Sequence, residues 1–351
     1  MTGPNPRRLW AEAPLLETPL GKKLANRLPM AGQRANIPPS EYRNFGAGDV
    51  VLTEHRGRFV KSCPGTPEYR CCGLKIIHFG LGCSLDCTYC ILQSYLDSTA
   101  LVLFGNVETG LADMETMLDQ PDAPKRYCTG EFTDSLLLEH FTGFGQRLVK
   151  MFARRPNHVL ELKTKTDHID DLLDLDHNGR TIISFSVNAQ AVCEREERRA
   201  APLAKRLAAA ERAVKAGYRL GFHFDPLIRH AGWEAGYERT VEAIYSRIPP
   251  DRIAWISLGA FRYMAPLKDV VRRKHPHSPI MDEEFILAAD GKMRYLRPVR
   301  VEMYGRLLET IRRCDPEAPV YLCMESPRVW KEVFGFDPGP EGLIDRLDFR
   351  V

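Results

Sequence analysis

The stretch GCSLDCTYCILQ, residues 82–93, places three of the ten cysteines within eight residues, at Cys83, Cys87 and Cys90. Thiolates are soft ligands that suit iron–sulfur clusters and zinc. A [4Fe–4S] cluster normally takes four cysteines, and a structural zinc site takes four ligands. A C-x3-C-x2-C group with no second C-x2-C pair leaves one metal position open, which is typical of a catalytic site. The alternative is a zinc site completed by His78 or a distant cysteine.

Polar residues also stand at the ends of predicted strands, where a barrel enzyme has its chemistry. They are Gly130, Glu131, Lys163, Lys165, Ser186, Asn188, His223, Asp225, Ser257, Cys323 and Glu325. Lys163 and Lys165 are two residues apart, so both point to one face of their strand. Inside a barrel, two ammonium groups need anionic partners. His223 and Asp225 have the same spacing and could contact substrate or each other, or could form an ordinary buried pair.

Several further residues could have either a functional or an ordinary structural role. The adjacent Cys71 and Cys72 cannot both face the same way in an extended chain, and one of them could approach the cysteine loop. For these two and for Cys323, a buried free cysteine is the commoner outcome. The basic run RRKH, residues 272–275, and the arginine pairs at 154–155 and 312–313 could contact phosphates, although most such runs are solvated helix faces.

The elements that must position these residues alternate between strand and helix. Short apolar runs predict strands, and segments with helical periodicity separate them. The predicted strands are 73–80, 125–131, 158–166, 180–188, 218–227, 251–260 and 319–326. The predicted helices are 134–155, 168–175, 197–217, 232–248 and 301–314. Residues 281–298, MDEEFILAADGKMRYLRP, resemble a loop or hairpin inserted late in this series.

This alternation predicts an α/β fold, a partial (β/α) barrel of about six parallel strands. Residues 1–70 are rich in proline, glycine and arginine, and predict an irregular N-terminal extension. The barrel is expected over 71–335 and a C-terminal tail over 336–351. Because the cysteine loop follows the first barrel strand, it should lie at the same mouth as the polar strand ends.

Composition limits the class of protein. The chain has 351 residues, 44% of them apolar, and a net charge of +3, which permits nucleic-acid binding without favouring it. The N-terminal sequence has no apolar signal-peptide region, and no apolar run approaches the ~20 residues of a membrane span. We therefore expect a cytoplasmic protein that does not enter a membrane, where clustered cysteines bind metal or do chemistry rather than form disulfides.

The cysteine spacing in a loop after the first barrel strand resembles the radical S-adenosylmethionine (SAM) superfamily. Within it, several stretches resemble spore photoproduct lyase and its relatives from about residue 70 onward. They are CTYCILQ (87–93), TKTDHIDDLLDLDHNGRT (164–181), FSVN (185–188), RLAAAERAVKAGYRLGF (206–222) and IRHAGWEAGY (228–237). The resemblance implies a partial barrel, a [4Fe–4S] cluster, SAM, and hydrogen-atom abstraction that splits a thymine dimer adduct in DNA. It also implies an electron donor such as flavodoxin or ferredoxin.

The resemblance assigns roles residue by residue. Cys83, Cys87 and Cys90 match the cluster ligands, and Tyr89 matches a catalytic tyrosine that would also shield the cluster. Lys165 matches the lysine that holds the SAM carboxylate. Ser186 and Asn188 match polar positions near SAM. Gly130 and Glu131 resemble the Gly-Gly-Glu element that contacts the SAM amine, a carboxylate facing an ammonium.

Two departures from the lyase pattern affect the expected reaction. Ile91 stands where the lyase has a second tyrosine, and Glu131 stands where it has a hydrogen-donating cysteine. Cys128, three residues before Glu131, is the nearby thiol, and it could point into the barrel wall. The substrate is therefore left open, as DNA or a small molecule.

Three functions follow from this sequence. The first is radical SAM chemistry through a 5′-deoxyadenosyl radical. The second is an atypical SAM cleavage that transfers a 3-amino-3-carboxypropyl group to an acceptor such as trivalent arsenic, as proposed for lyase-like proteins of arsinothricin biosynthesis; Cys71, Cys72 or Cys323 could hold that acceptor. The third is a nucleic-acid-binding protein with a structural cluster, against which the open metal position and the polar barrel mouth both argue.

Overall fold

The computed structural model describes residues 6–66, 68–96, 98–120, 125–339 and 343. Its largest sheet has the order β16-β12-β11-β10-β9-β8-β5-β4, and all neighbours in it are parallel except β4 and β5. The strands are β4 (Val60–Ser62), β5 (Lys75–Ile77), β8 (Arg126–Cys128), β9 (Val159–Thr164), β10 (Thr181–Ser186), β11 (Arg219–Leu227), β12 (Ile253–Ala260) and β16 (Val320–Leu322). Seven parallel strands thus form the predicted open barrel.

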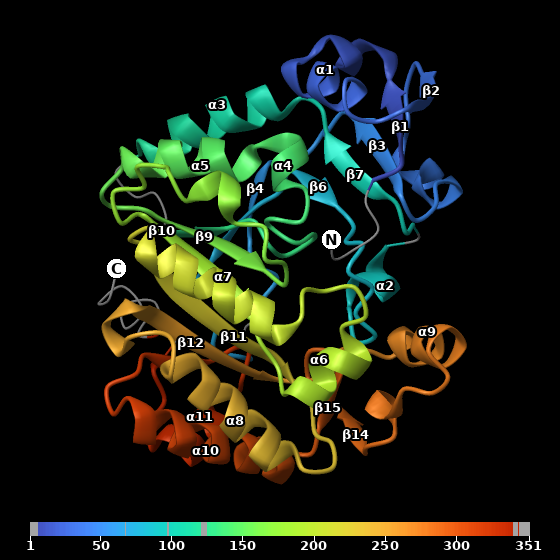
Figure 1. The fold of residues 1–351 in the computed structure, drawn as a ribbon. Helices are drawn as coiled ribbons and strands as arrows, with labels where there is room; N and C mark the ends of the chain where they lie inside the picture. Colours follow the sequence, from blue (N-terminus) through green and yellow to red (C-terminus); the bar gives the residue numbers. More distant parts are fainter. Residues whose placement is uncertain (1–5, 67, 97, 121–124, 340–342, 344–351) are drawn as a thin grey trace.

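Helices cover the outer face of this sheet (Figure 1). Of these, α5 (Phe144–Ala153), α7 (Leu203–Lys215) and α10 (Arg297–Cys314) contact the strands. Packed beside them are α4 (Glu139–Thr142), α6 (Gln190–Glu196), α8 (Trp233–Tyr245) and α11 (Pro327–Phe334), and α3 (Val107–Leu118) lies next to α5. Every residue of β10 and β12 is buried, because a parallel sheet is covered on both faces. That double cover explains why these strands are continuous apolar runs in the sequence.

The predicted single helix over 134–155 is wrong. Residues 134–138 form a loop, because the Asp134 carboxylate accepts hydrogen bonds from the amides of Leu136 and Leu137. The helix that follows breaks at Gly143, whose φ of +71° lies in the left-handed region that favours glycine. The result is two helices, α4 and α5, with the loop directed toward the strand ends.

The N-terminal segment is an extension of the barrel, as expected, but it has regular elements where an irregular chain was predicted. It forms a second sheet in the order β2-β1-β3-β7-β6, above the barrel in Figure 1. Its elements are β1 (Arg8–Glu12), α1 (Pro19–Ala25), β2 (Met30–Arg34), β3 (Asp49–Thr53), β6 (Gly80–Leu81) and β7 (Leu101–Phe104). Its strands have only two to five residues each, so the sequence gave little periodicity to detect.

The expected boundary at residue 70 does not separate the two sheets, because strands on each side of it pair with the sheet of the other side. β4 lies before that position and pairs with β5 of the barrel, whereas β6 and β7 lie after it and belong to the second sheet. The backbone of Arg70 also bridges to Glu325, and its side chain pairs with Asp337 at 2.7 Å. Residues 340–342 and 344–351 of the expected C-terminal tail lie outside the described residues.

A three-stranded sheet and two helices complete the rim of the barrel. The hairpin expected within 281–298 is present as β14 (Phe285–Leu287) and β15 (Lys292–Tyr295), joined by β13 (Arg262–Met264) into a three-stranded antiparallel sheet. The short helix α2 (Leu92–Tyr95) directly follows the cysteine loop and packs beside α9 (Pro266–Lys274).

Candidate active site

A cavity of about 270 Å³ lies at the carboxyl ends of the barrel strands. The cysteine loop forms one wall of it and the strand ends form another. Ten of the residues expected at the site line it, namely Cys83, Cys87, Tyr89, Cys90, Gly130, Glu131, Lys163, Lys165, Ser186 and Asp225. The tertiary structure therefore brings together side chains from the cysteine loop and four strand ends.

The cysteine loop is held in place by its own backbone. Cys87 forms a β-bridge with Glu197, and the amide of Thr88 donates to the carbonyl of Glu196 at 2.8 Å. The Gln93 side-chain amide donates to the carbonyls of Cys87 and Thr88 at 3.0 and 3.1 Å. These contacts leave the three thiols free to serve as ligands on the cavity wall.

The environment of these thiols fits a metal cluster. Burial raises the pKa of Cys83, Cys87 and Cys90, and the three thiols repel each other as thiolates, which raises the pKa of Cys83 and Cys87 further. Lys165 opposes this effect at Cys87 and Cys90. Buried thiolates need compensating positive charge, and iron ions with a nearby ammonium would supply it.

The zinc alternative finds no support in the donor geometry. Across the described ranges, no group of three histidine, cysteine or acidic side chains is arranged around a single ion. His78 does not line the cavity; its ring packs edge-on against His55 and Phe104, and burial lowers its pKa to about 3. In a [4Fe–4S] cluster, the thiolates bind separate irons and need not converge on one ion.

Two lysines and a glutamate line the same cavity as the cysteines. Burial opposes the charge of Lys163, but attraction from Cys128, Glu131, Glu161 and Asp225 outweighs it and raises its pKa. The Lys165 ammonium lies 5.7 Å from the centre of the Tyr89 ring. A Cβ atom at Gly130 would lie 3.0 Å from the Cβ and carbonyl oxygen of Lys163, so a side chain there would crowd this strand end.

Asp134 fixes this part of the wall and was not among the expected site residues. Its carboxylate accepts hydrogen bonds from the Lys165 amide and the Thr164 hydroxyl, both at 2.7 Å. The side chain thereby joins the loop after β8 to the end of β9. In the sequence, Asp134 is identifiable only as an aspartate a few residues after a predicted strand. This pattern is also common in ordinary turns, so it did not indicate a site residue.

Tyr89 belongs to a buried chain of three polar groups. Its phenol donates to Glu197, whose other carboxylate oxygen pairs with Arg206. Arg206 also donates to the carbonyl of Ser186 at 2.8 Å. Burial raises the pKa of Glu197, but Arg206 and Lys165 outweigh that effect and lower it overall. The cysteine loop is thus tied to β10 and α7 by residues that the sequence did not single out.

Asp225 pairs with Arg262 instead of His223. The two Arg262–Asp225 hydrogen bonds measure 3.2 and 3.4 Å, and Arg262 also lies 3.5 Å from the Cys323 sulfur. Asp225 and Arg262 line the cavity, whereas Cys323 stands behind them. Burial opposes ionisation of Asp225, but Arg262 and Lys163 lower its pKa.

His223, Asn188 and Cys128 do not line the cavity. His223 hydrogen-bonds Glu161 at 2.6 Å, deeper in the barrel. Asn188 donates to the carbonyl of Pro226 and accepts from Tyr237, so its amide is occupied by protein partners. Cys128 accepts from the amide of Gly130, and burial raises its pKa to about 12. Their expected contacts with cofactor or substrate stay predictions.

Cys71 and Cys72 also lie outside the cavity lining. Cys72 is half-buried near Arg126, and a hydrogen bond with Cys71 together with burial raises its pKa. Cys71 contacts Cys63 in the same way. These thiols form a separate group beside β4 and β5.

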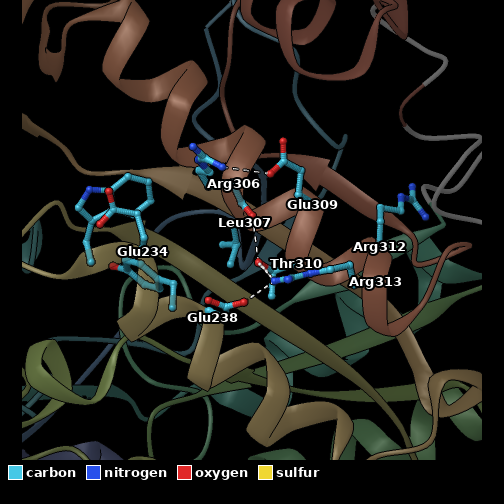
Figure 2. A pocket seen from close by; sticks show the side chains of 10 residues that line it. Glu234, Glu238, Arg306, Leu307, Glu309, Thr310, Arg312 and Arg313 are labelled. Atoms are coloured by element: carbon cyan, nitrogen blue, oxygen red, sulfur yellow. Dashed lines mark hydrogen bonds and ion pairs between the residues drawn. The ribbon is translucent and has the colours of Figure 1, made fainter.

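A hollow of about 860 Å³ lies on the outer face, between α8 and α10 (Figure 2). Its charged side chains pair with one another, Arg306 with Glu309 at 3.6 Å and Arg313 with Glu238. The hollow has no cysteine and lies away from the strand ends, so we assign the site to the cavity beside the cysteine loop.

Comparison with known proteins agrees with this geometry. The family model described as spore photoproduct lyase matches residues 5–300. The chain is 31% identical to spore photoproduct lyase of Bacillus subtilis (strain 168), over 80% of this chain and 85% of that protein. It is 28% identical to the enzyme of a Geobacillus species, over 79% and 85% of the two chains.

Solved structures give the same fold. Spore photoproduct lyase complexed with dinucleoside spore photoproduct superposes with a TM-score of 0.78 at 24% identity, covering 91% of this chain and 99% of that one. A variant of that enzyme with bound AdoMet and dinucleoside spore photoproduct gives 0.79 at 23% identity, with the same coverage. No helix in the described parts of the chain is long and apolar enough to cross a membrane.

Proposed function

Because the chain belongs to the spore photoproduct lyase family of radical SAM enzymes, we propose that its cavity cleaves SAM and directs the resulting radical chemistry at an organic substrate. The cofactors of this family are a [4Fe–4S] cluster and SAM. The observation that carries the proposal is that Cys83, Cys87 and Cys90 line one cavity together with two lysines and a glutamate.

The chain's own residues divide the work in this proposal. Cys83, Cys87 and Cys90 would hold the [4Fe–4S] cluster. Glu131 accepts the SAM ammonium and Lys165 binds its carboxylate, since both are charged strand-end groups on the cavity wall. When bound, the cluster supplies the electron that cleaves the SAM sulfonium reductively.

The residues that line the cavity determine whether a cysteine can return a hydrogen atom to the substrate radical. Among the described residues that line it, the only cysteines are the three proposed ligands. Glu131 takes the strand-end position, and Cys128 is buried behind it with 1% exposure. We infer that no cysteine of the cavity wall returns a hydrogen atom to the substrate, in contrast to the lyase pattern implied by the resemblance.

This lining also favours a second candidate. Transfer of a 3-amino-3-carboxypropyl group breaks a different carbon–sulfur bond of SAM, forms a bond to an acceptor and releases 5′-methylthioadenosine. Such a transfer requires no hydrogen atom returned from a cysteine. The absence of a donor thiol from the described lining is therefore compatible with it.

One experiment tests both candidates. The protein is reconstituted anaerobically with iron and sulfide, reduced with dithionite and incubated with SAM, and the nucleoside product is identified by mass spectrometry. 5′-Deoxyadenosine supports the first reaction, and 5′-methylthioadenosine supports the second. Neither product in the presence of an intact cluster would contradict both. Adding a dinucleoside spore photoproduct, the ligand named for the solved relatives, then tests whether this chain splits it.

A further inference from the structure

Exposed cations gather on the surface beside the cysteine loop. They come from the last turn of α9 and from the segment after α6, and we call them the basic surface: Arg198, Arg199, Arg272, Arg273 and Lys274. In the described chain, no ion pair joins Arg199, Arg272, Arg273 or Lys274 to a carboxylate, and Arg198 has only Asp86 at 3.9 Å. Asp269 is the exposed acid on α9. The surface therefore carries an excess of positive charge.

Two contacts connect the basic surface to the cysteine loop. The Lys274 ammonium lies 3.5 Å from the side-chain oxygen of Gln93, and the amide nitrogen of Gln93 donates to the carbonyls of Cys87 and Thr88. Arg198 contacts Asp86, the residue before Cys87. Helices α2 and α9 lie side by side at this edge of the molecule (Figure 1). One side chain, Gln93, thus separates a surface cation from the backbone of a proposed cluster ligand.

The basic surface is not part of the cavity. None of its five residues lines the cavity, whereas the cysteine loop does. Asp86 and Gln93 receive the contacts from the basic surface, and neither of them lines the cavity. The loop residues that contact the basic surface therefore differ from those that line the cavity, and a molecule on that surface need not enter the substrate's space.

We propose that the basic surface is the docking site of an acidic one-electron donor protein of the flavodoxin or ferredoxin class. The inference rests on the proposed function, which takes one electron from outside the chain; the donor is oxidised by one electron and the cluster is reduced by one. Complementary charge steers such partners into weak, short-lived complexes. A nucleic-acid substrate fits the surface less well, because its reacting base must reach the cavity on the other side of the loop.

Binding of a purified flavodoxin to the full-length reconstituted protein tests the proposal. The double variant Arg272→Glu, Arg273→Glu should weaken binding at least tenfold at low ionic strength. The milder Arg272→Gln, Arg273→Gln should weaken it less and should flatten its dependence on salt. The control Lys150→Glu, Arg154→Glu makes the same charge change on exposed residues of α5 and its C-cap and should leave affinity within about twofold. Thermal melts confirm that each variant is folded.

The outcomes separate this inference from the proposed function. SAM cleavage driven by dithionite bypasses the donor, so it should be equal in wild type and the α9 variants. If dithionite produces no SAM cleavage in the wild-type protein, the proposed function fails. The docking site is still tested in that case, because flavodoxin binding is measured independently of SAM cleavage. Equal loss of affinity in the control overturns the docking site. A lower affinity of the α9 variants for a short DNA duplex also overturns it. This holds if those variants still bind flavodoxin, and it holds if they lose flavodoxin and DNA binding to the same extent.

Discussion

The phenol of Tyr89 donates its hydrogen bond to Glu197, a residue 108 positions later in the chain. Both side chains are buried, and Glu197 is held in turn by Arg206. This relationship connects the cysteine loop to β10 and α7 through three polar groups. The tyrosine between the second and third cysteines is therefore fixed in orientation, with its ring beside Lys165.

The variant Tyr89→Phe removes this hydrogen bond and leaves one oxygen of a buried carboxylate without a partner. We expect the free energy of unfolding to fall by about 1–3 kcal/mol, the cost of an unsatisfied buried group. Iron content after reconstitution should stay near the wild-type value, because no ligand is lost. Chemical denaturation and iron analysis measure the two. Tyr95→Phe is the matched control, since Tyr95 is 51% exposed; an equal effect there would refute the role of the bond.

The variant Cys87→Ala should lose most of the iron and the brown colour of the reconstituted protein. Two remaining thiolates cannot hold a cluster that needs three or four. Cys314→Ala, at the end of α10 and outside the cavity lining, should keep both. Iron analysis and visible absorption check the difference. Full iron content in Cys87→Ala would rule out its assignment as a ligand.

Lys165→Met should weaken SAM binding to the reconstituted protein at least tenfold. The loss of one charge-assisted hydrogen bond corresponds to roughly 1.5–3 kcal/mol. Lys165→Arg keeps the charge and should retain most of the affinity. Equilibrium dialysis under anaerobic conditions gives the dissociation constants, and Lys150→Met on the outer face of α5 serves as control. An unchanged constant in Lys165→Met would remove this residue from the SAM site.

The buried pair of Glu161 and His223 predicts a pH-dependent stability. Burial raises the pKa of Glu161, but attraction from His223 and Arg126 and the hydrogen bonds from His223 and Ser184 outweigh it and lower that pKa to about 2. Trp255 also donates to the same carboxylate oxygen at 3.2 Å. A pKa below the ordinary 4.5 stabilises the folded state above about pH 4.5, and this contribution is lost as the pH falls toward 2.

The variant Glu161→Gln tests the direction of this pH dependence of stability. It should be less stable than wild type at pH 7, and the gap should narrow as the pH falls from about 4.5 toward 2. Urea titrations at several pH values measure it. Glu309→Gln, on the exposed side of α10, should show no such pH-dependent gap. A constant difference across this window would mean that Glu161 is not ionised in the folded protein.

The sequence by itself determined the cofactor chemistry and the class of fold. Ligand spacing in Cys83, Cys87 and Cys90 is a local property, so it can be identified without knowing the rest of the structure. The alternation of apolar strands and amphipathic helices is likewise local, and it predicted the parallel barrel and the mouth at which its strands end. The N-terminal sheet escaped detection because its short strands carry little periodicity.

Only the tertiary structure decided which polar side chains meet. Asp225 and His223 lie two residues apart on β11, yet one pairs with Arg262 at the cavity and the other with Glu161 inside the barrel. Strand register and the closure of the barrel set those partners, and neither is encoded in local spacing. The link from Tyr89 to Glu197 depends in the same way on a loop after α6 reaching back to the cysteines. The chain's sequence thus predicts the metal ligands, whereas folding selects the groups that surround them.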